Sequence, residues 1–296
     1  MCAMCGDEKM IQAYKEGKDL YAQIASISFN KPYEDCLEFR KDGTTNKEGK
    51  DRRTSAKSIL LGILYGRGIA SVAEQLHTTK RKAQEIQDKI FKGFPAIKKF
   101  EEDTVKFAEE NGYVTTFWGR KRRLPEMQLP EFEFKWKPGF GDVDPLSFDE
   151  NTIDSEVPED IKHIYISKIR QNPYKRKSVY EEANANGILI VDNGGKIADA
   201  TRQCVNSRIQ GSAADMSKLA GINIQNNKRL KELGFRLLVP IHDEYLAEVP
   251  VKNAKEASEI FSKCMCDAAK PLGIPISTDV CASYQWYGDE VNLNTL

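Results

Sequence analysis

Near the end of the chain, two apolar segments at residues 235–241 and 245–249 are separated by only three polar residues, His242, Asp243 and Glu244. Apolar runs of this length are typical of β-strands, and a connection this short joins antiparallel neighbours. The pattern therefore predicts a β-hairpin with the polar triplet at its turn. Helical patterns precede and follow this hairpin, and the combination of helices with an antiparallel sheet predicts an α+β fold.

The other elements are predicted from hydrophobic spacing and from Gly, Pro and Asn at segment ends. Helices are predicted at 7–30 with a break at Gly17, at 52–65 before Gly66-Arg67-Gly68, after a cap at Ser71, from Pro95 to Asn111, at 196–225 and at 253–269. Strands are predicted at 113–118, at 188–191 before a tight turn at 192–195, and near 276–282. Residues 40–51 are predicted to form a polar loop, and residues 125–187 lack a regular period.

The charge of the chain is balanced in total but not along the sequence. The 296 residues contain 44 Lys plus Arg and 44 Asp plus Glu, yet residues 126–160 carry 11 acids and two bases. The remaining residues therefore have a net charge of +9, and residues 161–177 carry six bases and no acid. Nucleic acid stays open as a partner. Segment 126–195 is interpreted as an insertion, whose acidic half either folds against the basic half or is solvated.

Composition excludes several classes of protein. Apolar residues make up 40% of the chain, enough for a globular core, and no apolar run approaches the roughly 18 residues of a transmembrane helix. Asp7 and Glu8 interrupt the N-terminal segment before a signal peptide could form, so a cytoplasmic protein is expected. Cys2 and Cys5 have the spacing of zinc ligands, but no second pair completes the site. Reduced thiols are therefore predicted.

The predicted hairpin turn is the first candidate site. Adjacent carboxylates at Asp243 and Glu244 repel each other unless a cation compensates, and Mg²⁺ prefers carboxylate oxygens. The alternative is an ordinary polar turn. The apolar segments on both sides favour a site, because they would hold the turn in a fixed position.

The helix predicted at 52–65 is the second candidate. Arg53, Lys57, Leu61 and Tyr65 are four residues apart and therefore follow one another along one face. Such a face matches a nucleoside triphosphate, with its phosphates on the two cations and its base near Tyr65. An amphipathic helix with solvated cations has the same spacing. The glycines at 62 and 66 weaken a helix and indicate a close approach of another group.

The helix predicted at 196–225 is the third candidate. Arg202, Asn206 and Gln210 place long hydrogen-bonding side chains on one helical face, which suits sugar-phosphate oxygens and base edges in a minor groove. A polar solvent-exposed face is the alternative. The small residues that follow, Gly211-Ser212-Ala213-Ala214, indicate a crowded contact with another element.

Together and in this order, these motifs resemble the C-terminal part of family A DNA polymerases, the bacterial polymerase I type, and especially the bacteriophage branch. The first helix is similar to the family's Arg-x3-Lys-x3-aromatic-x3-Tyr-Gly motif. The second helix resembles its Arg-x3-Asn-x3-Gln-Gly-Ser/Thr-Ala-Ala-Asp stretch, and the hairpin resembles its His-Asp-Glu turn. Residues 112–125 and Trp286 are also typical of the family. The resemblance covers the chain except for the insertion.

This resemblance implies template-directed DNA synthesis, in which a nucleotide passes from a dNTP to the 3′-hydroxyl of a primer. Asp243 and Glu244 would bind Mg²⁺ in a two-ion site, and Lys57 would protonate the leaving pyrophosphate. The residues expected to bind the nucleotide are Arg53, Lys57, Leu61, Tyr65 and Tyr21. The residues expected to contact DNA are Gly66, Arg202, Asn206, Gln210 and His242.

The chain departs from the family pattern at three places. Leu61 stands where the family has an aromatic residue, which puts discrimination between sugars in doubt. Tyr21 stands where the family has a phosphate-binding His. The family's other metal-binding aspartate belongs to an Asp-Tyr-Ser-Gln-x-Glu motif, expected about a dozen residues before Gly6-Asp7-Glu8, and this chain begins inside the helix that follows. Asp243 and Glu244 are therefore not expected to suffice for a two-ion mechanism.

The resemblance predicts an incomplete polymerase right hand, with helical fingers and a partial palm. Its expected parts are entry helices from palm to fingers at 1–50, fingers with the nucleotide-binding helix at 51–125, the insertion at 126–195 and the palm with the hairpin at 196–296. The chain is expected to be a piece of a split or truncated polymerase.

The expected partners are primer-template DNA, dNTPs and a second polypeptide with the missing motif, the thumb and an exonuclease region. No membrane partner is expected, and a phage-encoded chain would be located in the cytoplasm of the infected bacterium. Two alternatives stay open. One is an inactive remnant that binds DNA or nucleotides. The other is a single-subunit RNA polymerase, against which Glu244 and the run at 210–215 argue.

Overall fold

The computed structural model describes residues 2–64, 66–137 and 156–295. It divides into two compact units, Met1–Arg123 with Arg202–Leu296, and Leu124–Thr201. The longer helices are α2 (Glu8–Lys15), α3 (Leu20–Phe29), α4 (Lys47–Leu64), α6 (Lys80–Gly93), α7 (Pro95–Asn111), α8 (Glu159–Gln171), α9 (Arg176–Ala185), α10 (Gly194–Asn226) and α12 (Ala254–Ala268). Shorter helices are α1 (Cys2–Cys5), α5 (Ile69–Gln75) and α11 (Lys228–Glu232). The strands are β1 (Tyr113–Thr115), β2 (Lys121–Arg123), β3 (Phe132–Trp136), β4 (Ile188–Asp192), β5 (Arg236–Ile241) and β6 (Glu244–Glu248).

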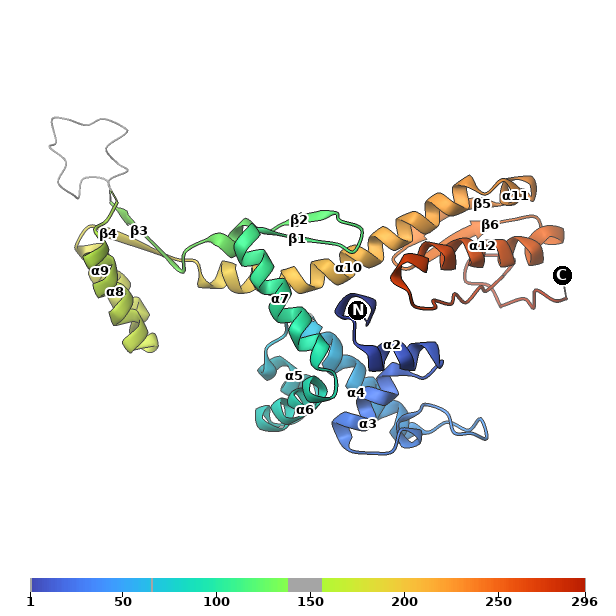
Figure 1. Ribbon diagram of the computed structural model, residues 1–296, viewed down its shortest axis with the longest axis horizontal. Helices are drawn as coiled ribbons and strands as arrows, with labels where there is room; N and C mark the ends of the chain where they lie inside the picture. Colours follow the sequence, from blue (N-terminus) through green and yellow to red (C-terminus); the bar gives the residue numbers. More distant parts are fainter. Residues whose placement is uncertain (1, 65, 138–155, 296) are drawn as a thin grey trace. The chain divides into compact units, whose positions relative to one another are not determined.

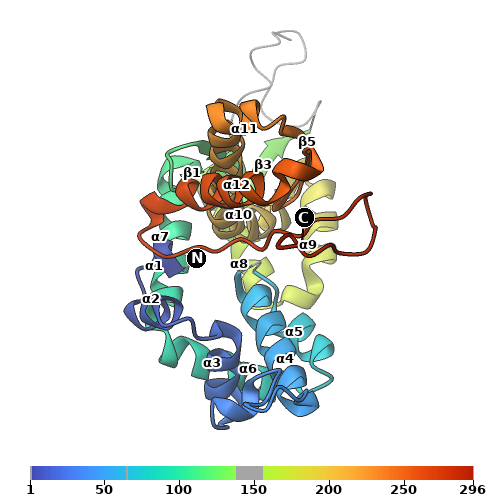
Figure 2. The ribbon, with the colours of Figure 1, turned by 90° about the vertical axis from the view of Figure 1, so that its right-hand side faces the viewer.

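In the described residues, the strands form antiparallel pairs, β1 with β2, β3 with β4 and β5 with β6. This mostly helical arrangement with small hairpin sheets confirms the predicted α+β class. In the first unit, α2 to α6 form one cluster in both views (Figures 1 and 2). Their apolar faces share a core that includes Met10, Ile24, Ile59, Ile90 and Phe94.

Local sequence signals explain where several of these helices begin and end. Asp7 caps α2 and Asp19 caps α3, because each carboxylate accepts a hydrogen bond from a backbone N–H three residues later. Pro95 occupies the first turn of α7, as predicted, and Gly112 ends that helix in the left-handed conformation.

Helix α4 begins earlier than the sequence predicted. Residues 47–51 were expected to belong to a polar loop, but they form the first turns of the helix. The Asn46 side chain accepts a hydrogen bond from the Gly49 amide at 3.1 Å, which satisfies one of the unpaired donors at the helix start. This cap, with good helix formers such as Lys47 and Glu48 behind it, explains the difference.

Three other local predictions were wrong. Ser71 lies inside α5, whose N-cap is Gly68. Residues 192–195 do not form a separate tight turn between β4 and the next helix, because β4 ends at Asp192 and α10 begins at Gly194. Residues 276–282 run without a strand partner in the described residues, although their apolar alternation is strand-like.

The predicted hairpin is confirmed as β5 and β6, with Ile241 paired to Glu244 across the turn. Apolar side chains of the hairpin join a second core with the end of α10, α11 and α12; its buried members include Ile224, Leu230 and Phe261. This packing holds the base of the hairpin while its turn projects from the core.

The second unit is built around β3 and β4, which pack with α8 and α9 on a small core that contains Phe132, Ile169 and Ile188. Part of the expected pairing between acidic and basic segments is present here. Arg170 forms an ion pair with Glu131 at 3.2 Å, and Lys162 forms one with Glu159 at 2.7 Å. The acids at 142–154 lie outside the described residues.

Within the described part of the chain, no helix is both long enough and apolar enough to cross a membrane.

Candidate nucleotide and nucleic-acid site

The pairing of α3 with α4 brings together three of the predicted nucleotide-binding residues. The guanidinium carbon of Arg53 lies 5.5 Å from the centroid of the Tyr21 ring, and the Lys57 ammonium lies 5.6 Å from the same centroid. The opposite face of α4 is buried through Ala56 and Ile59. The helix is therefore amphipathic, and its two cations converge over one aromatic ring instead of extending separately into solvent.

Arg53 is also held by an acid that the sequence analysis did not single out. Its Nε donates to Oδ2 of Asp19 at 2.6 Å. Burial is the main reason that the pKa of Tyr21 is raised, and the positive charge of Arg53 offsets part of the rise. The Tyr21 hydroxyl thus stays protonated at neutral pH and can donate a hydrogen bond to a phosphate oxygen.

The C-terminal end of α4 reaches the second predicted motif. Gly62 lies close to Val72, because a Cβ at residue 62 would come within 3.3 Å of its Cγ2. Gly66 has φ +62°, and a Cβ there would be only 2.7 Å from Cγ of Arg202. These contacts confirm the close approaches expected at both glycines. Leu61 is half-buried on α4, whereas Tyr65 lies outside the described residues.

Helix α10 carries the predicted DNA-binding face. Arg202 and Gln210 are exposed and Asn206 is partly buried, in successive turns of the helix. The Oδ1 atom of Asn206 is buried without a hydrogen-bond partner among the described residues. Such an atom costs stability, which is expected where a polar group serves a ligand.

The small residues after Gln210 form the predicted crowded contact. The β1–β2 hairpin packs here, and a Cβ at Gly211 would lie 2.8 Å from Cγ2 of Thr116. The Ser212 hydroxyl accepts a hydrogen bond from the Phe117 amide at 2.8 Å. The lack of a side chain at Gly211 thus allows the β1–β2 hairpin to approach α10 closely. The hydrogen bond to Ser212 holds the hairpin in this position.

An ion pair closes the same contact. Arg120 donates from Nε to Oδ1 of buried Asp215 at 2.7 Å and from Nη2 to the Gly211 carbonyl at 3.1 Å. The motif at 210–215 therefore has a structural task beside its exposed face, because it anchors the hairpin that carries the basic residues Arg122 and Arg123.

The polar turn of β5–β6 differs from both helices. His242 has φ +55°, and the side chains of His242, Asp243 and Glu244 are exposed. Neither carboxylate accepts a hydrogen bond or forms an ion pair within the described part of the chain. Among these residues, no group of three or more His, Cys, Asp or Glu could hold a metal ion. The turn fits Mg²⁺ only in part, because it offers two carboxylates and no other described residue adds a third.

The C-terminal segment places Trp286 near the hairpin. Its ring stacks on Tyr287, with 5.4 Å between ring centroids. Cys281 is exposed in this segment, and its thiol pKa is raised chiefly by Glu290 and to a smaller extent by Glu244. Trp286 was singled out only through the family resemblance, and in the structure it lines a groove with the hairpin residue Leu238.

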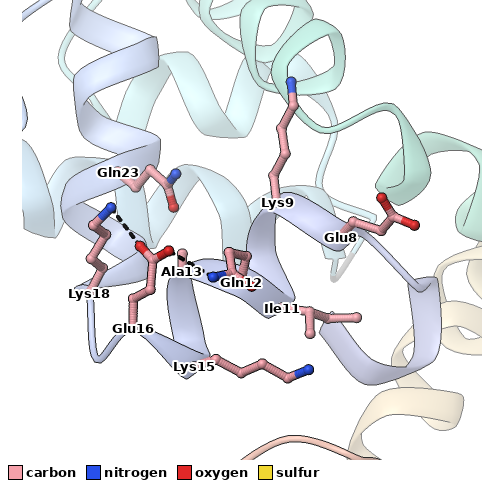
Figure 3. Close-up of a pocket in the computed structure, with 9 residues that line it drawn as sticks. All are labelled: Glu8, Lys9, Ile11, Gln12, Ala13, Lys15, Glu16, Lys18 and Gln23. Carbon is pink, nitrogen blue, oxygen red and sulfur yellow. Dashed lines mark hydrogen bonds and ion pairs between the residues drawn. The ribbon is translucent and has the colours of Figure 1, made fainter.

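One surface pocket lies apart from every predicted site residue. It has a volume of about 630 Å³ and is formed by α2, the turn after it and α3 (Figure 3). Glu16 pairs with Lys18 at 2.7 Å and accepts a hydrogen bond from Gln12 at 2.8 Å. Gln23 lines the same pocket, and its Oε1 is buried without a partner among the described residues.

Sequence reasoning missed the contacts of three residues, Asp19, Arg120 and Asp215. Asp19 had a usable signal, because an Asp directly before a helical pattern is a typical N-cap. No local signal connects it to Arg53, which follows 34 residues later. Arg120 and Asp215 stand inside motifs already noted, but their pairing depends on how β1–β2 packs on α10.

Several curated proteins resemble this chain over almost its whole length. DNA polymerase I of Chloroflexus aurantiacus is 25% identical over 283 residues, which are 96% of this chain and 22% of that protein. The thermostable DNA polymerase I of Thermus thermophilus is 26% identical, over 96% of this chain and 25% of its own length. DNA polymerase I of Lactococcus lactis is 26% identical, over 95% and 24%. The chain therefore spans about a quarter of these relatives.

A solved structure has the same fold. It is the POL domain of Pol1 from M. smegmatis in complex with DNA primer-template and dNTP, and it superposes with a TM-score of 0.62. The sequences are 23% identical, and the match covers 93% of this chain and 35% of the other. At this identity the likeness concerns the fold.

The family model of DNA polymerase family A matches residues 1–137 and 160–288. Residues 138–159 interrupt the match. The match extends over both helix motifs and the hairpin. Since it covers well over half of the sequence, this chain belongs to DNA polymerase family A.

Proposed function

We propose that this chain provides the nucleotide-binding and part of the catalytic machinery for template-directed DNA synthesis. The observation that carries the proposal is the arrangement of Arg53 and Lys57 over Tyr21 in a chain of this family. Two cations and a phenol hydroxyl on one surface suit the phosphates of an incoming dNTP. Lys57 is exposed and can reach a leaving pyrophosphate, to which it would donate a proton.

The DNA-facing part of the proposal rests on α10. Arg202, Asn206 and Gln210 would contact the duplex in its minor groove, where side-chain donors meet acceptors of the base edges. Contact with Gly66 places Arg202 at the end of the nucleotide helix. In the proposed complex, the base of the incoming nucleotide and the first duplex pairs would therefore meet near Gly66, with Leu61 and Tyr65 beside the nucleotide and His242 near the primer terminus.

Asp243 and Glu244 would supply carboxylates for Mg²⁺. When bound, two such ions stabilise charge on the attacking and leaving oxygens of a phosphoryl transfer. The described residues offer only these two carboxylates at the turn, and a two-ion site would need a further acid. We propose that it belongs to a second polypeptide that carries an Asp-Tyr-Ser-Gln-x-Glu motif and the thumb.

The hairpin has an apolar surface that fits this partner. Leu238 is 52% exposed and Val239 is 38% exposed, both on β5 of a two-stranded sheet. A groove of about 440 Å³ beside them is lined by apolar residues such as Leu246, Val280 and Trp286. Exposed apolar surface next to unpaired strand edges is suited to a further strand and its side chains.

In the proposed right hand, residues 1–50 lead from palm to fingers, 51–125 form the fingers, 126–195 contain the insertion and 196–296 belong to the palm. Within 126–195, only residues 138–159 lie outside the family match. A bacteriophage origin, and with it a location in the infected host cell, is part of the same proposal. It rests on the order of the motifs along the chain.

Primer extension tests the proposal. The purified chain would be assayed with primer-template, dNTPs and Mg²⁺, alone and mixed with the product of the gene immediately upstream. Incorporation is expected only in the mixture, and it should disappear with Asp243→Asn. Absence of incorporation in the mixture, or equal incorporation with the variant, would contradict the proposal. Incorporation by the chain alone would contradict the need for a partner, and preference for rNTPs would indicate an RNA polymerase.

The second candidate is a DNA- or nucleotide-binding remnant without activity. It is favoured by the incomplete set of carboxylates at the hairpin. Binding of primer-template or dNTP by the chain, with no incorporation in any mixture, would support this alternative.

A further inference from the structure

Asp19 uses its two carboxylate oxygens for two different partners. Oδ1 accepts the Ala22 amide at 3.0 Å and thereby caps α3. Oδ2 accepts a hydrogen bond from Nε of Arg53 at 2.6 Å, and this bond joins the start of α3 to the middle of α4. The two side chains are 27% and 28% exposed, so the ion pair lies at the edge of the α3–α4 surface and not in the core.

Capping alone does not explain the second contact. Asp7 caps α2 with the same backbone angles, φ −71° and ψ 107°, and accepts the Met10 amide at the same distance of 3.0 Å. Asp7 forms no ion pair among the described residues. The caps at Asp7 and Asp19 thus have the same backbone geometry, and of these two only the one at Asp19 is joined to a cation of α4.

The contact with Asp19 orients the guanidinium of Arg53 in a particular way. Nε is occupied, whereas Nη1 and Nη2 make no hydrogen bond to the described residues. The guanidinium also lies over the Tyr21 ring at 5.5 Å. The backbone of Asp19 is also restrained, because its amide donates a hydrogen bond to the Tyr33 hydroxyl at 2.9 Å. The guanidinium of Arg53 is therefore restrained through Nε, whereas Nη1 and Nη2 stay available for a ligand.

We propose that Asp19 is a positioning residue for phosphate binding, which holds Arg53 so that Nη1 and Nη2 face the phosphates of a nucleoside triphosphate. This inference rests on the proposed nucleotide site. Bidentate contact of an arginine with phosphate depends on the orientation of its planar fork. A free arginine side chain loses rotamer freedom when it binds, and an arginine already held by Asp19 loses less.

The test compares Asp19→Asn with Asp7→Asn in the full chain. Asn is as good an N-cap as Asp, so each variant keeps its helix cap, and only Asp19→Asn removes the charged partner of Arg53. Binding of inorganic tripolyphosphate would be measured by titration calorimetry, because this probe contains the phosphates without the base. Asp19→Asn is expected to weaken binding roughly three- to tenfold, and Asp7→Asn is expected to leave it unchanged.

A second comparison separates positioning from a general structural effect. In an Arg53→Ala background, Asp19→Asn should cause no further loss, because the residue that it positions is gone. An equal loss with and without Arg53 would overturn the inference, and so would unchanged or tighter binding by Asp19→Asn. If the unaltered chain does not bind tripolyphosphate, the proposed nucleotide site itself fails, and the inference fails with it.

Discussion

The α4 surface and the β5–β6 turn carry the two halves of the proposed chemistry, and they differ in how far this chain completes them. On α4, Arg53 is bonded to Asp19, and both cations of the helix lie over Tyr21. At the turn, Asp243 and Glu244 are exposed, and no third acid of the described residues joins them. The proposed phosphate-binding half is assembled within the described residues, whereas these residues do not complete the proposed metal-binding half.

This difference follows from the chemistry of each half. Two cations can be held by one aromatic ring and one carboxylate, all of which come from adjacent helices. Two divalent ions need carboxylates from several segments, because each ion takes six or more oxygen ligands. A chain can therefore contain a complete phosphate-binding surface while its metal site still lacks ligands from a further segment.

The largest expected effect comes from Asp243→Asn in the complemented primer-extension reaction. Loss of a metal carboxylate should lower kcat by roughly 10³-fold or more, since the ions supply several kcal/mol of transition-state stabilisation. Tripolyphosphate binding by the chain alone should not change. Glu259→Gln, at an exposed position of α12, is the matched control. Weaker tripolyphosphate binding by Asp243→Asn would show that the two halves are not independent.

Lys57→Ala should have the next largest effect. If Lys57 protonates the leaving pyrophosphate, kcat should fall roughly 10²- to 10⁴-fold in the complemented reaction. Single-turnover measurements would check it, since they separate the chemical step from nucleotide binding. Loss of affinity for dNTP with unchanged kcat would mean that Lys57 only binds phosphate.

Gly66→Ala tests the contact between α4 and α10. Gly66 and Gly17 have nearly equal positive φ angles, +62° and +66°, but only Gly66 faces Arg202. Gly17→Ala should cost about 1 kcal/mol of unfolding free energy from backbone strain. Gly66→Ala should cost about 2–3 kcal/mol, because the new Cβ also overlaps Arg202. Urea unfolding measures both variants, and equal losses would mean that this contact contributes nothing.

The smallest expected effect reports on the hairpin turn through Cys281. Nearby carboxylates, Glu290 first and then Glu244 among the lesser causes, raise the pKa of this thiol. A cation bound at the turn would lower that pKa and increase the thiolate fraction, so alkylation at pH 7–8 should become about twofold faster on addition of Mg²⁺.

Site-resolved mass spectrometry can follow this change in Cys281. Cys204 is the internal control, because burial raises the pKa of its thiol to about 11. A Mg²⁺ effect that persists in Asp243→Asn with Glu244→Gln would show that the cation binds elsewhere.

The elements predicted best from the sequence were those with strong local patterns. The spacing of residues 53 to 65 predicted α4, and the short polar link predicted the β5–β6 hairpin. Strand-like alternation at 276–282 gave a wrong prediction, because a strand also needs a partner, which local pattern does not supply. The early start of α4 was missed because the cap at Asn46 stands within a polar stretch.

The site could be predicted only where one helix or turn contains it. The faces of α4 and α10 follow from residue spacing, but contacts between distant segments do not. Packing of α3 on α4 brings Asp19 to Arg53, and packing of the β1–β2 hairpin on α10 brings Arg120 to Asp215. Nothing in the local sequence pattern connects such pairs.

The central claim is that the chain assembles its phosphate-binding half without help from the metal-binding half. Tripolyphosphate titration of the chain alone, in the presence of EDTA, tests it most directly. The account predicts saturable binding without Mg²⁺, weakened at least roughly tenfold when Arg53 and Lys57 are both replaced by alanine. Binding that requires Mg²⁺, or that is unchanged in the double variant, would contradict it.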